Sequence, residues 1–170
     1  MKLITLTRGK TAKVDDADFD WLMQWNWCAR PSRWKNSENV VWYACRRRRA
    51  SECNGKRVGN IDMHVVLLGP SPLGYWDHKD GDGLNNQRDN LRPATCTQNN
   101  GNRRITRNNT SGFKGVCFKN GAFEATIYKQ NCGIYLGRFK EPELAAQAYD
   151  SEAINYFGEF AVTNESLGLL

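Results

Sequence analysis

The sequence of 170 residues predicts an α+β fold, and three observations carry that prediction. Residues 1–70 contain short apolar segments of alternating character that are typical of β-strands. Residues 112–140 contain three more strand-like segments, separated by turn residues. Residues 142–158 place apolar side chains at the spacing of an amphipathic helix. We therefore expect a β-rich N-terminal platform, a compact strand–loop–helix unit, and a three-stranded antiparallel sheet packed on one helix.

The composition indicates a globular protein. Hydrophobic residues make up 40% and charged residues 25% of the chain, which is long enough for one medium domain or two small ones. No apolar run approaches the roughly 18 residues of a membrane span, so no membrane partner is expected. The N-terminal MKLITLTRGK is too short and too polar for a signal peptide. We expect a cytoplasmic protein.

Positive charge is clustered in two stretches of this chain, whose formal net charge is +6. Residues 100–119 hold five Lys or Arg and no acid. Residues 28–60 hold nine basic residues against two glutamates. The nine are Arg30, Arg33, Lys35, Arg46, Arg47, Arg48, Arg49, Lys56 and Arg57. Clustered charge of this kind favours a polyanion partner such as nucleic acid, although a solvated basic face is the alternative.

The first 70 residues can be assigned segment by segment. ITLTRGKTAKVDD predicts a strand, a turn at Gly9 and a second strand. DFDWLMQWNW predicts a short helix whose tryptophans pack in a core, although an exposed tryptophan could stack on a base. VVWYACRRRR predicts a strand with Arg46 and Arg48 on its outer face, directed toward a nucleic-acid backbone. The apolar IDMHVVLLG closes the segment before Pro70.

Residues 71–111 change from a turn-rich to a basic composition. Gly81, Gly83 and repeated Asn and Asp residues predict an irregular loop between a strand and a helix. Pro93 is expected to open that helix, because proline suits the first helical turn. The polar, basic stretch that follows has Ile105 as its one apolar residue, and we assign residues 103–111 as a linker.

The C-terminal part predicts a sheet packed on a helix. FKGVCF, AFEATIY and GIYLGRF are the expected strands, with turns at Asn120-Gly121 and at residues 131–133. In the middle strand, Phe123, Ala125 and Ile127 share one face, whereas Glu124, Thr126 and Tyr128 share the other. The helix is expected between Pro142 and Gly158. Its apolar stripe should cover one face of the sheet and leave the other free; the stripe comprises Leu144, Ala145, Ala148, Tyr149, Ala153 and Phe157.

The cysteines give no support for a structural zinc site. The chain has six of them, and none forms a C-x-x-C pair. We interpret them as reduced, partly buried residues.

The segment DHKDGDGLNNQRDNLRPATCTQNN, residues 77–100, contains the most specific motif. A calcium loop does not fit it, because Leu84 would take a ligand position and the twelfth-position glutamate is missing. The segment resembles the D-H…N…N variant of the HNH endonuclease family, as found in phage and intron-encoded enzymes. The upstream MHVVLLG resembles the segment that often precedes this motif, with Val65 in place of an arginine.

The HNH resemblance implies a role for four residues. His78 would be the general base that activates water, and Asn90 would hold the loop that orients it. Asp77 and Asn99 would ligate one divalent metal ion, Mg²⁺ or Mn²⁺. The alternative for His78 alone is a hydrogen-bonded turn histidine. We interpret His64, the second histidine, as structural, with a phosphate contact near the site as the alternative.

Residues 112–164 carry a second resemblance, to the APETALA2/ERF DNA-binding domain. It rests on FKGV…AFEATI…YLGRFKEPELAAQAYDSEA…FGEFAVTN. The resemblance implies that the three-stranded sheet binds in the major groove. Cys117 and Tyr128 occupy positions where plant members often carry arginine. The residues expected to contact DNA are Arg46, Arg48, Arg103, Arg104, Lys114, Lys119, Thr126, Tyr128 and Tyr135.

The two resemblances together predict a metal-dependent DNA endonuclease of the site-preferring nicking or homing type. The expected domains are residues 1–102, with the nuclease motif in 71–102, and residues 112–170 for DNA binding. One motif per chain implies nicking of double-stranded DNA by a monomer, unless two chains pair on the duplex, with 3′-hydroxyl and 5′-phosphate products. A fragment ending near Thr106 is expected to keep nicking at low salt. The alternative is a non-catalytic DNA-binding regulator with a decayed nuclease motif.

Overall fold

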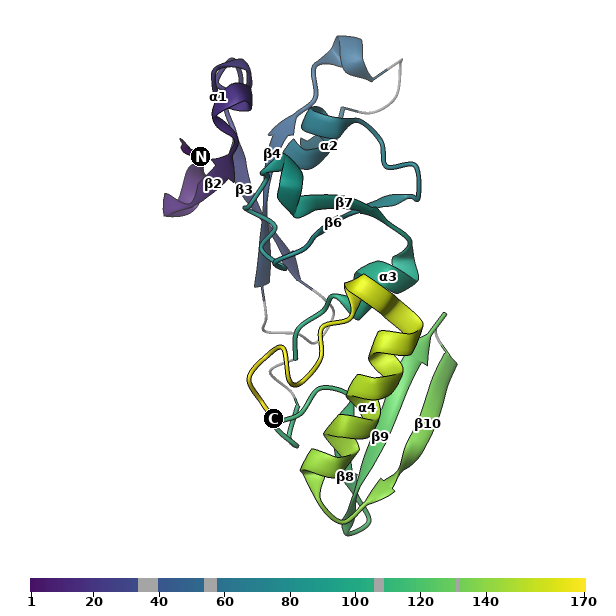
Figure 1. The fold of residues 1–170 in the computed structure, drawn as a ribbon. Coiled ribbons are helices and arrows are strands. Elements are labelled where there is room, and N and C mark those ends of the chain that lie inside the picture. The colour runs from purple at the N-terminus through teal and green to yellow at the C-terminus, as the bar shows by residue number, and fades with distance from the viewer. Residues whose placement is uncertain (34–39, 54–57, 106–108, 131) are drawn as a thin grey trace. The chain divides into compact units, whose positions relative to one another are not determined.

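The computed structural model of the chain describes residues 1–33, 40–53, 58–105, 109–130 and 132–170. It is an α+β protein with several antiparallel sheets and four α-helices in these ranges, as the sequence predicts. The chain forms two compact units, Met1–Ala94 and Thr95–Leu170, each described by itself below (Figure 1). None of the helices in the described ranges is both long enough and apolar enough to cross a membrane.

The first unit begins with the predicted hairpin and with a helix that ends before the last residues of the predicted segment DFDWLMQWNW. Strands β1 (Lys2–Thr5) and β2 (Thr11–Val14) pair antiparallel, and a 3₁₀ turn at Thr7–Gly9 joins them. Gly9 has a positive φ of 64°, which glycine adopts without steric cost. Helix α1 (Asp16–Leu22) follows directly.

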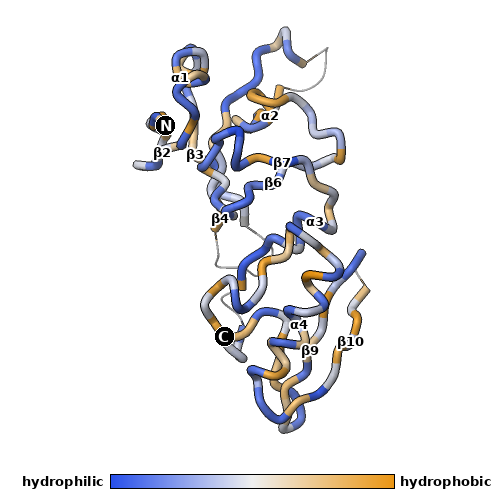
Figure 2. Tube along the Cα trace, in the orientation of Figure 1, coloured by the Kyte–Doolittle hydropathy of each residue, from blue (hydrophilic) through white to orange (hydrophobic). Residues whose placement is uncertain are grey.

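A three-stranded antiparallel sheet forms the centre of the first unit. Its strands are β3 (Cys28–Arg33), β4 (Val40–Arg47) and β5 (Asn60–Asp62), in the order β3-β4-β5. The 3₁₀ helix η2 (Ala50–Glu52) lies between β4 and β5. Helix α2 (Met63–Leu68) continues from β5, and its apolar residues make it largely orange in Figure 2.

The predicted strand and loop of residues 71–102 are confirmed, but the start of the helix is not. Strand β6 (Tyr75–His78) pairs antiparallel with a second strand, β7 (Leu91–Ala94), and the loop between them ends in the 3₁₀ helix η3 (Arg88–Asn90). Pro93 lies within β7 opposite Trp76, so the prediction that it opens the helix is wrong. A two-stranded sheet leaves one edge of each strand unpaired, and proline is tolerated there. Helix α3 (Cys96–Gly101) begins after Thr95, whose side chain forms a capping box with Gln98.

The core of the first unit is built from the hairpin, the central sheet and α2. Leu22 and Met63 are fully buried, and Trp27 donates from its indole N–H to the backbone of Leu22 at 2.9 Å. The predicted packing role therefore holds for Trp27, whereas Trp21 is 44% exposed. The buried cluster consists of Ile4, Leu6, Ala12, Val14, Leu22, Trp27, Ala29, Ala44, Met63, Leu67 and Leu91.

The second unit contains the predicted three-stranded sheet. Strands β8 (Val116–Lys119), β9 (Ala122–Lys129) and β10 (Cys132–Phe139) pair antiparallel in the order β10-β9-β8. Asn120 and Gly121 have φ values of 50° and 80°, as the tight turn of an Asn-Gly hairpin requires. Asn131, within the second predicted turn, lies outside the described residues. Hydrophobic and hydrophilic residues alternate along β9 and β10 in Figure 2.

Helix α4 (Pro142–Phe157) covers one face of this sheet, as predicted (Figure 1). Proline occupies its first turn, and Gly158 follows its last residue at φ 55°. The predicted stripe is buried except at Leu144, which is 46% exposed, and Ala148, which is partly buried. The short 3₁₀ helix η4 (Gly158–Phe160) follows.

Helix α3 packs within the second unit, against α4. A Cβ on Gly101 would lie 2.6 Å from the ring of Phe157, so only glycine allows this approach. The division by packing therefore falls between Ala94 and Thr95, ahead of the expected linker at residues 103–111. Residues 106–108 of that linker lie outside the described residues, and the assigned domain limits stay a prediction.

Candidate nuclease site and DNA-binding face

Asp77 and His78 are the last two residues of β6. Asp77 is 3% exposed and pairs in register with Arg92 of β7. The guanidinium Nε of Arg92 donates to Oδ2 of Asp77 at 2.9 Å, so this carboxylate is fixed by a neighbouring cation. Alternation along a strand directs His78 to the opposite face of the ribbon from Asp77.

The two histidines of the chain meet in the first unit. The rings of His64, on α2, and His78 lie 5.2 Å apart between centroids, at an interplanar angle of 84°. The ring of Tyr43, on β4, contacts both, with centroids 5.8 Å from His78 and 6.2 Å from His64. Edge-to-face packing of this kind restricts the orientation of each ring. His64 is therefore a buried packing residue, as expected, and it also lies beside the motif residue His78, as the alternative requires.

Both histidines are held in their neutral form near pH 7. Burial and, after it, the proximity of His78 lower the pKa of His64 to about 4. Burial also lowers the pKa of His78, and the negative charge of Asp80 offsets part of that effect. A neutral imidazole can accept a proton, whereas a lower pKa also makes it a weaker base.

Asn90 holds the loop that connects β6 to β7. Its amide Nδ2 donates to Oδ1 of Asp80 at 3.0 Å and to the carbonyl of Asn85 at 2.9 Å. Its Oδ1 accepts from the backbone N–H of Asp80 at 3.1 Å. Burial by itself would raise the pKa of Asp80, but hydrogen bonds from Asn85, the Asp82 backbone and Asn90 together lower it. Asn90, at the end of the loop, is therefore hydrogen-bonded to the start and the middle of the loop that follows His78.

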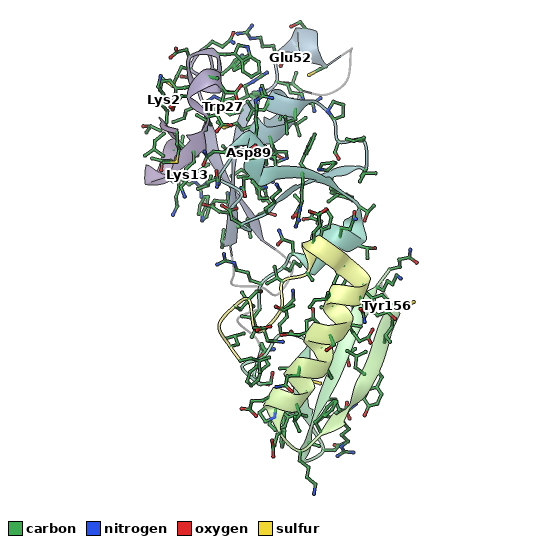
Figure 3. All side chains as sticks on the ribbon, in the orientation of Figure 1. Lys2, Lys13, Trp27, Glu52, Asp89 and Tyr156 are labelled. Atoms are coloured by element: carbon green, nitrogen blue, oxygen red, sulfur yellow. The ribbon has the colours of Figure 1, made fainter. Side chains whose placement is uncertain are left out.

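The N-terminal platform braces the same loop. Arg88 donates from Nε and Nη2 to the two carboxylate oxygens of Asp18, at 2.8 and 2.7 Å. The backbone of Lys13, labelled in Figure 3, accepts from the N–H of Asn86 at 2.8 Å. Gly83 approaches Tyr43 so closely that a Cβ would lie 2.8 Å from its ring. These contacts from α1, β2 and β4 give the N-terminal platform a role in shaping the motif.

Asn99, the fourth motif residue, lies on α3 and therefore belongs to the second unit. Its backbone N–H donates to the carbonyl of Thr95 at 3.0 Å. The structure brings Asp77, His78 and Asn90 into one unit, and they are joined by the β6–β7 ladder and the loop. Within the described ranges, no group of three or more His, Cys, Asp or Glu side chains is arranged to hold a metal ion.

The chemistry of Asp77 nevertheless fits one hard cation. A carboxylate offers about four lone-pair positions. Arg92 donates to Oδ2 of Asp77, so a cation would share this carboxylate with the guanidinium. A Mg²⁺ ion binds through one or two carboxylates and keeps several waters, so it needs no dense acidic cluster.

The predicted outward orientation of Arg46 is wrong. Arg46 is 5% exposed, and its guanidinium forms two hydrogen bonds to Glu52, at 2.7 and 2.9 Å. It also lies over the ring of Trp25 at 4.6 Å. The bonds from Arg46 lower the pKa of Glu52 to about 2. Arg48 follows the end of β4 and is partly exposed, so the two arginines do not share one outer face.

The free face of the sheet in the second unit carries four of the predicted DNA contacts. Thr126 and Tyr135 are direct partners across β9 and β10, and Tyr128 is paired with Gly133. Tyr128 and Tyr135 are 66% and 59% exposed. Lys119 lies on the same face, at the end of β8. α4 packs on the opposite face, against Ala125 and Ile127.

Lys114 is directed into the second unit. Its Nζ donates to the backbone carbonyls of Gly101 and Val162, at 2.8 Å each, and burial lowers its pKa to about 8. The expectation that it faces DNA does not match this orientation. Arg103 and Arg104 are exposed just after α3. Lys35, Lys56 and Arg57 of the basic cluster lie outside the described residues.

The sequence did not single out Arg92 or the Asp18–Arg88 pair, which the structure places against the motif residues. Arg92 stands two residues after Asn90, and a strand assignment for residues 91–94 would have placed it opposite Asp77. No sequence signal indicates the pairing of Asp18 with Arg88, because it joins residues 70 positions apart.

Comparison with known proteins gives partial similarities of two kinds. The chain is 36% identical over 114 residues, 64% of its length, to a protein of Acanthamoeba polyphaga mimivirus named an uncharacterized HNH endonuclease. It is 49% identical over 58 residues to protein 3.8 of Escherichia phage T7. It is 43% identical over 56 residues, 32% of its length, to an AP2/ERF and B3 domain-containing protein of Oryza sativa subsp. japonica.

These matches cover only part of each relative. The chain spans 59% of the mimivirus protein, 48% of the phage protein and 15% of the rice protein. No family model matches the chain. The similarity to an HNH endonuclease supports a nuclease family, and the expected combination of two modules remains a proposal.

Proposed function

We propose that the protein is a metal-dependent DNA endonuclease that nicks double-stranded DNA. The observation that carries the proposal is the arrangement of Asp77, His78 and Asn90 on a short antiparallel ribbon whose connecting loop is closed by Asn90. The similarity to a protein named HNH endonuclease supports the same reaction class.

His78 is the proposed general base. Its neutral imidazole accepts a proton from the water that attacks the scissile phosphate. The rings of His64 and Tyr43 hold the imidazole in one orientation. Asn90 maintains the backbone of the loop that follows His78 and so acts as a positioning residue.

Asp77 and Asn99 are the proposed ligands of one Mg²⁺ or Mn²⁺ ion. A hard divalent cation prefers carboxylate and amide oxygens, which these two side chains provide. Such an ion, when bound, stabilises negative charge on the phosphate and on the leaving oxygen. Arg92 orients the Asp77 carboxylate through the 2.9 Å bond to Oδ2.

The exposed face of the β8–β10 sheet is the proposed DNA-binding surface. Thr126, Tyr128 and Tyr135 form a contiguous patch on it, with Lys119 at its margin. Side chains on a sheet face reach base edges in the major groove, and lysine contributes a phosphate contact. The similarity to an AP2/ERF-containing protein supports this assignment.

Nicking of supercoiled plasmid tests the proposal. The purified full chain should convert the plasmid to open circles with Mg²⁺ or Mn²⁺, and EDTA should stop the reaction. His78→Ala should lose about 10²- to 10⁴-fold in rate, which is the usual effect of removing a general base. DNA affinity in a mobility-shift assay should persist, since phosphate contacts elsewhere supply most of it.

A matched pair of aspartate variants controls for loss of charge. Asp77→Ala should abolish cleavage, with partial recovery in excess Mn²⁺. Asp89→Ala removes an exposed aspartate of η3, labelled in Figure 3, and should cleave as the wild type does. Cleavage that survives EDTA would refute the metal-dependent mechanism. DNA binding without cleavage under any metal would instead favour a non-catalytic DNA-binding regulator.

A further inference from the structure

Helix α3, which carries the proposed metal ligand Asn99, is built into the second unit. It has six residues, and an isolated helix of that length is unstable in water. Its first turn is stabilised by the Thr95–Gln98 capping box. Beyond that box, its stability must come from packing and from partners for its last carbonyl groups.

Lys114 provides a partner at the C-terminal end of α3. Its ammonium donates to the carbonyl of Gly101, the last residue of α3, at 2.8 Å. The same ammonium donates to the carbonyl of Val162 at 2.8 Å, and the N–H of Val162 donates to Gly101 at 3.3 Å. A cation at a helix C-terminus also interacts favourably with the helix dipole. One partly buried lysine therefore joins the end of α3 to the segment after η4.

The backbone of Lys114 is itself held by buried polar groups. Asn164, which is fully buried, accepts from the Lys114 N–H at 2.6 Å and donates to the Lys114 carbonyl at 3.1 Å. Asp150 of α4 accepts from the side chain and the backbone N–H of Asn164, at 2.8 Å each. These bonds form a continuous path from α4 through Asn164 and Lys114 to the end of α3.

Packing provides a second, independent attachment. Gly101 lies against Phe157 so closely that a Cβ would be 2.6 Å from the ring. Phe157 is 6% exposed at the end of α4. Any side chain larger than hydrogen at position 101 must therefore displace α3 from α4.

We infer that the second unit is required for the cleavage step as well as for DNA binding, with Lys114, Gly101 and Phe157 as positioning residues that hold the helix carrying Asn99. This inference rests on the proposed function. It reverses the expectation that a fragment ending near Thr106 keeps nicking, because that fragment lacks Lys114 and Phe157.

The test uses the full chain and the variant Lys114→Met, with Lys140→Met as the control. Lys140 is an exposed lysine of the same unit. At saturating DNA, Lys114→Met should lower kcat at least 10-fold and raise the Mg²⁺ concentration needed for half-maximal cleavage. Binding of duplex DNA in a mobility-shift assay should stay within about twofold of wild type. Lys140→Met should match the wild type in kcat and in metal dependence.

Hydrogen exchange gives a readout that does not depend on cleavage. The amides of Asn99 and Asn102 donate within or just after α3, to Thr95 and Gln98. Their protection should fall in Lys114→Met and persist in Lys140→Met. Unchanged protection, or unchanged kcat and metal dependence, would overturn the inference. A wild-type chain that never cleaves would refute the proposed function, whereas exchange would still decide whether Lys114 anchors α3.

Gly101→Ala is the alternative test variant if Lys114→Met prevents folding of the second unit. Alanine favours helix formation more than glycine does, so lost cleavage would reflect displacement of α3 and not its unfolding. Cys96→Ala, at an exposed position of the same helix, is the matched control. Full activity of Gly101→Ala would overturn the inference.

Discussion

Acid should destabilise the first unit through His64. Its pKa is lowered to about 4, mainly by burial, whereas an exposed histidine titrates near 6.5. The unfolded chain therefore binds a proton at a pH where the folded chain does not. Under linkage, stability that is complete above pH 6.5 is lost as the pH falls toward 4.

The two pKa values give the size of this effect. At pH 5 the protonation of unfolded His64 favours unfolding by about 2 kcal/mol, and at pH 7 by about 0.2 kcal/mol. His78, whose pKa is also lowered, contributes in the same direction. A loss of about 2 kcal/mol is a large fraction of the stability of a small unit.

Tryptophan fluorescence measures this loss selectively. All six tryptophans precede residue 95, so their emission reports on the first unit alone. Urea unfolding of wild type and His64→Phe should be compared at pH 7 and pH 5. The variant should lose about 2 kcal/mol less than the wild type between these pH values. Any change in packing is the same at both pH values and cancels. Equal losses in the two proteins would refute the reasoning.

Three further predictions follow from single contacts. Arg92→Met removes the partner of the buried Asp77 carboxylate and should lower the unfolding free energy of the first unit by about 3 kcal/mol in the same fluorescence assay. Arg49→Met, at an exposed position, is the control and should leave this free energy unchanged. Equal stability of Arg92→Met and wild type would show that the Arg92–Asp77 pair contributes little. Tyr128→Ala should weaken duplex binding about 3- to 10-fold, or about 1 kcal/mol, without changing the thermal melt, and unchanged affinity would exclude this face. Asn120→Val places a β-branched residue at a φ of 50° and should destabilise the second unit by about 1–2 kcal/mol by circular dichroism, with Asn120→Gly as the neutral control.

Local features of this protein were determined by the sequence. The hairpin at Asn120-Gly121 was predictable because only a few residues adopt the positive φ that the turn requires. The helix between Pro142 and Gly158 was predictable from its end signals and apolar spacing. The sharing of one sheet face by Thr126 and Tyr128 follows from strand alternation alone.

Tertiary structure decided which polar side chains face inward. Strand alternation predicted that Arg46 faces DNA, and the APETALA2/ERF resemblance predicted the same for Lys114. A guanidinium or ammonium group turns inward where an acid or a backbone carbonyl group accepts its hydrogen bonds, and these partners come from elsewhere in the chain. The contact of His64 with His78 and the packing of α3 on α4 were likewise decided by tertiary structure. Each depends on contacts between segments distant in sequence, which local propensity and periodicity do not encode.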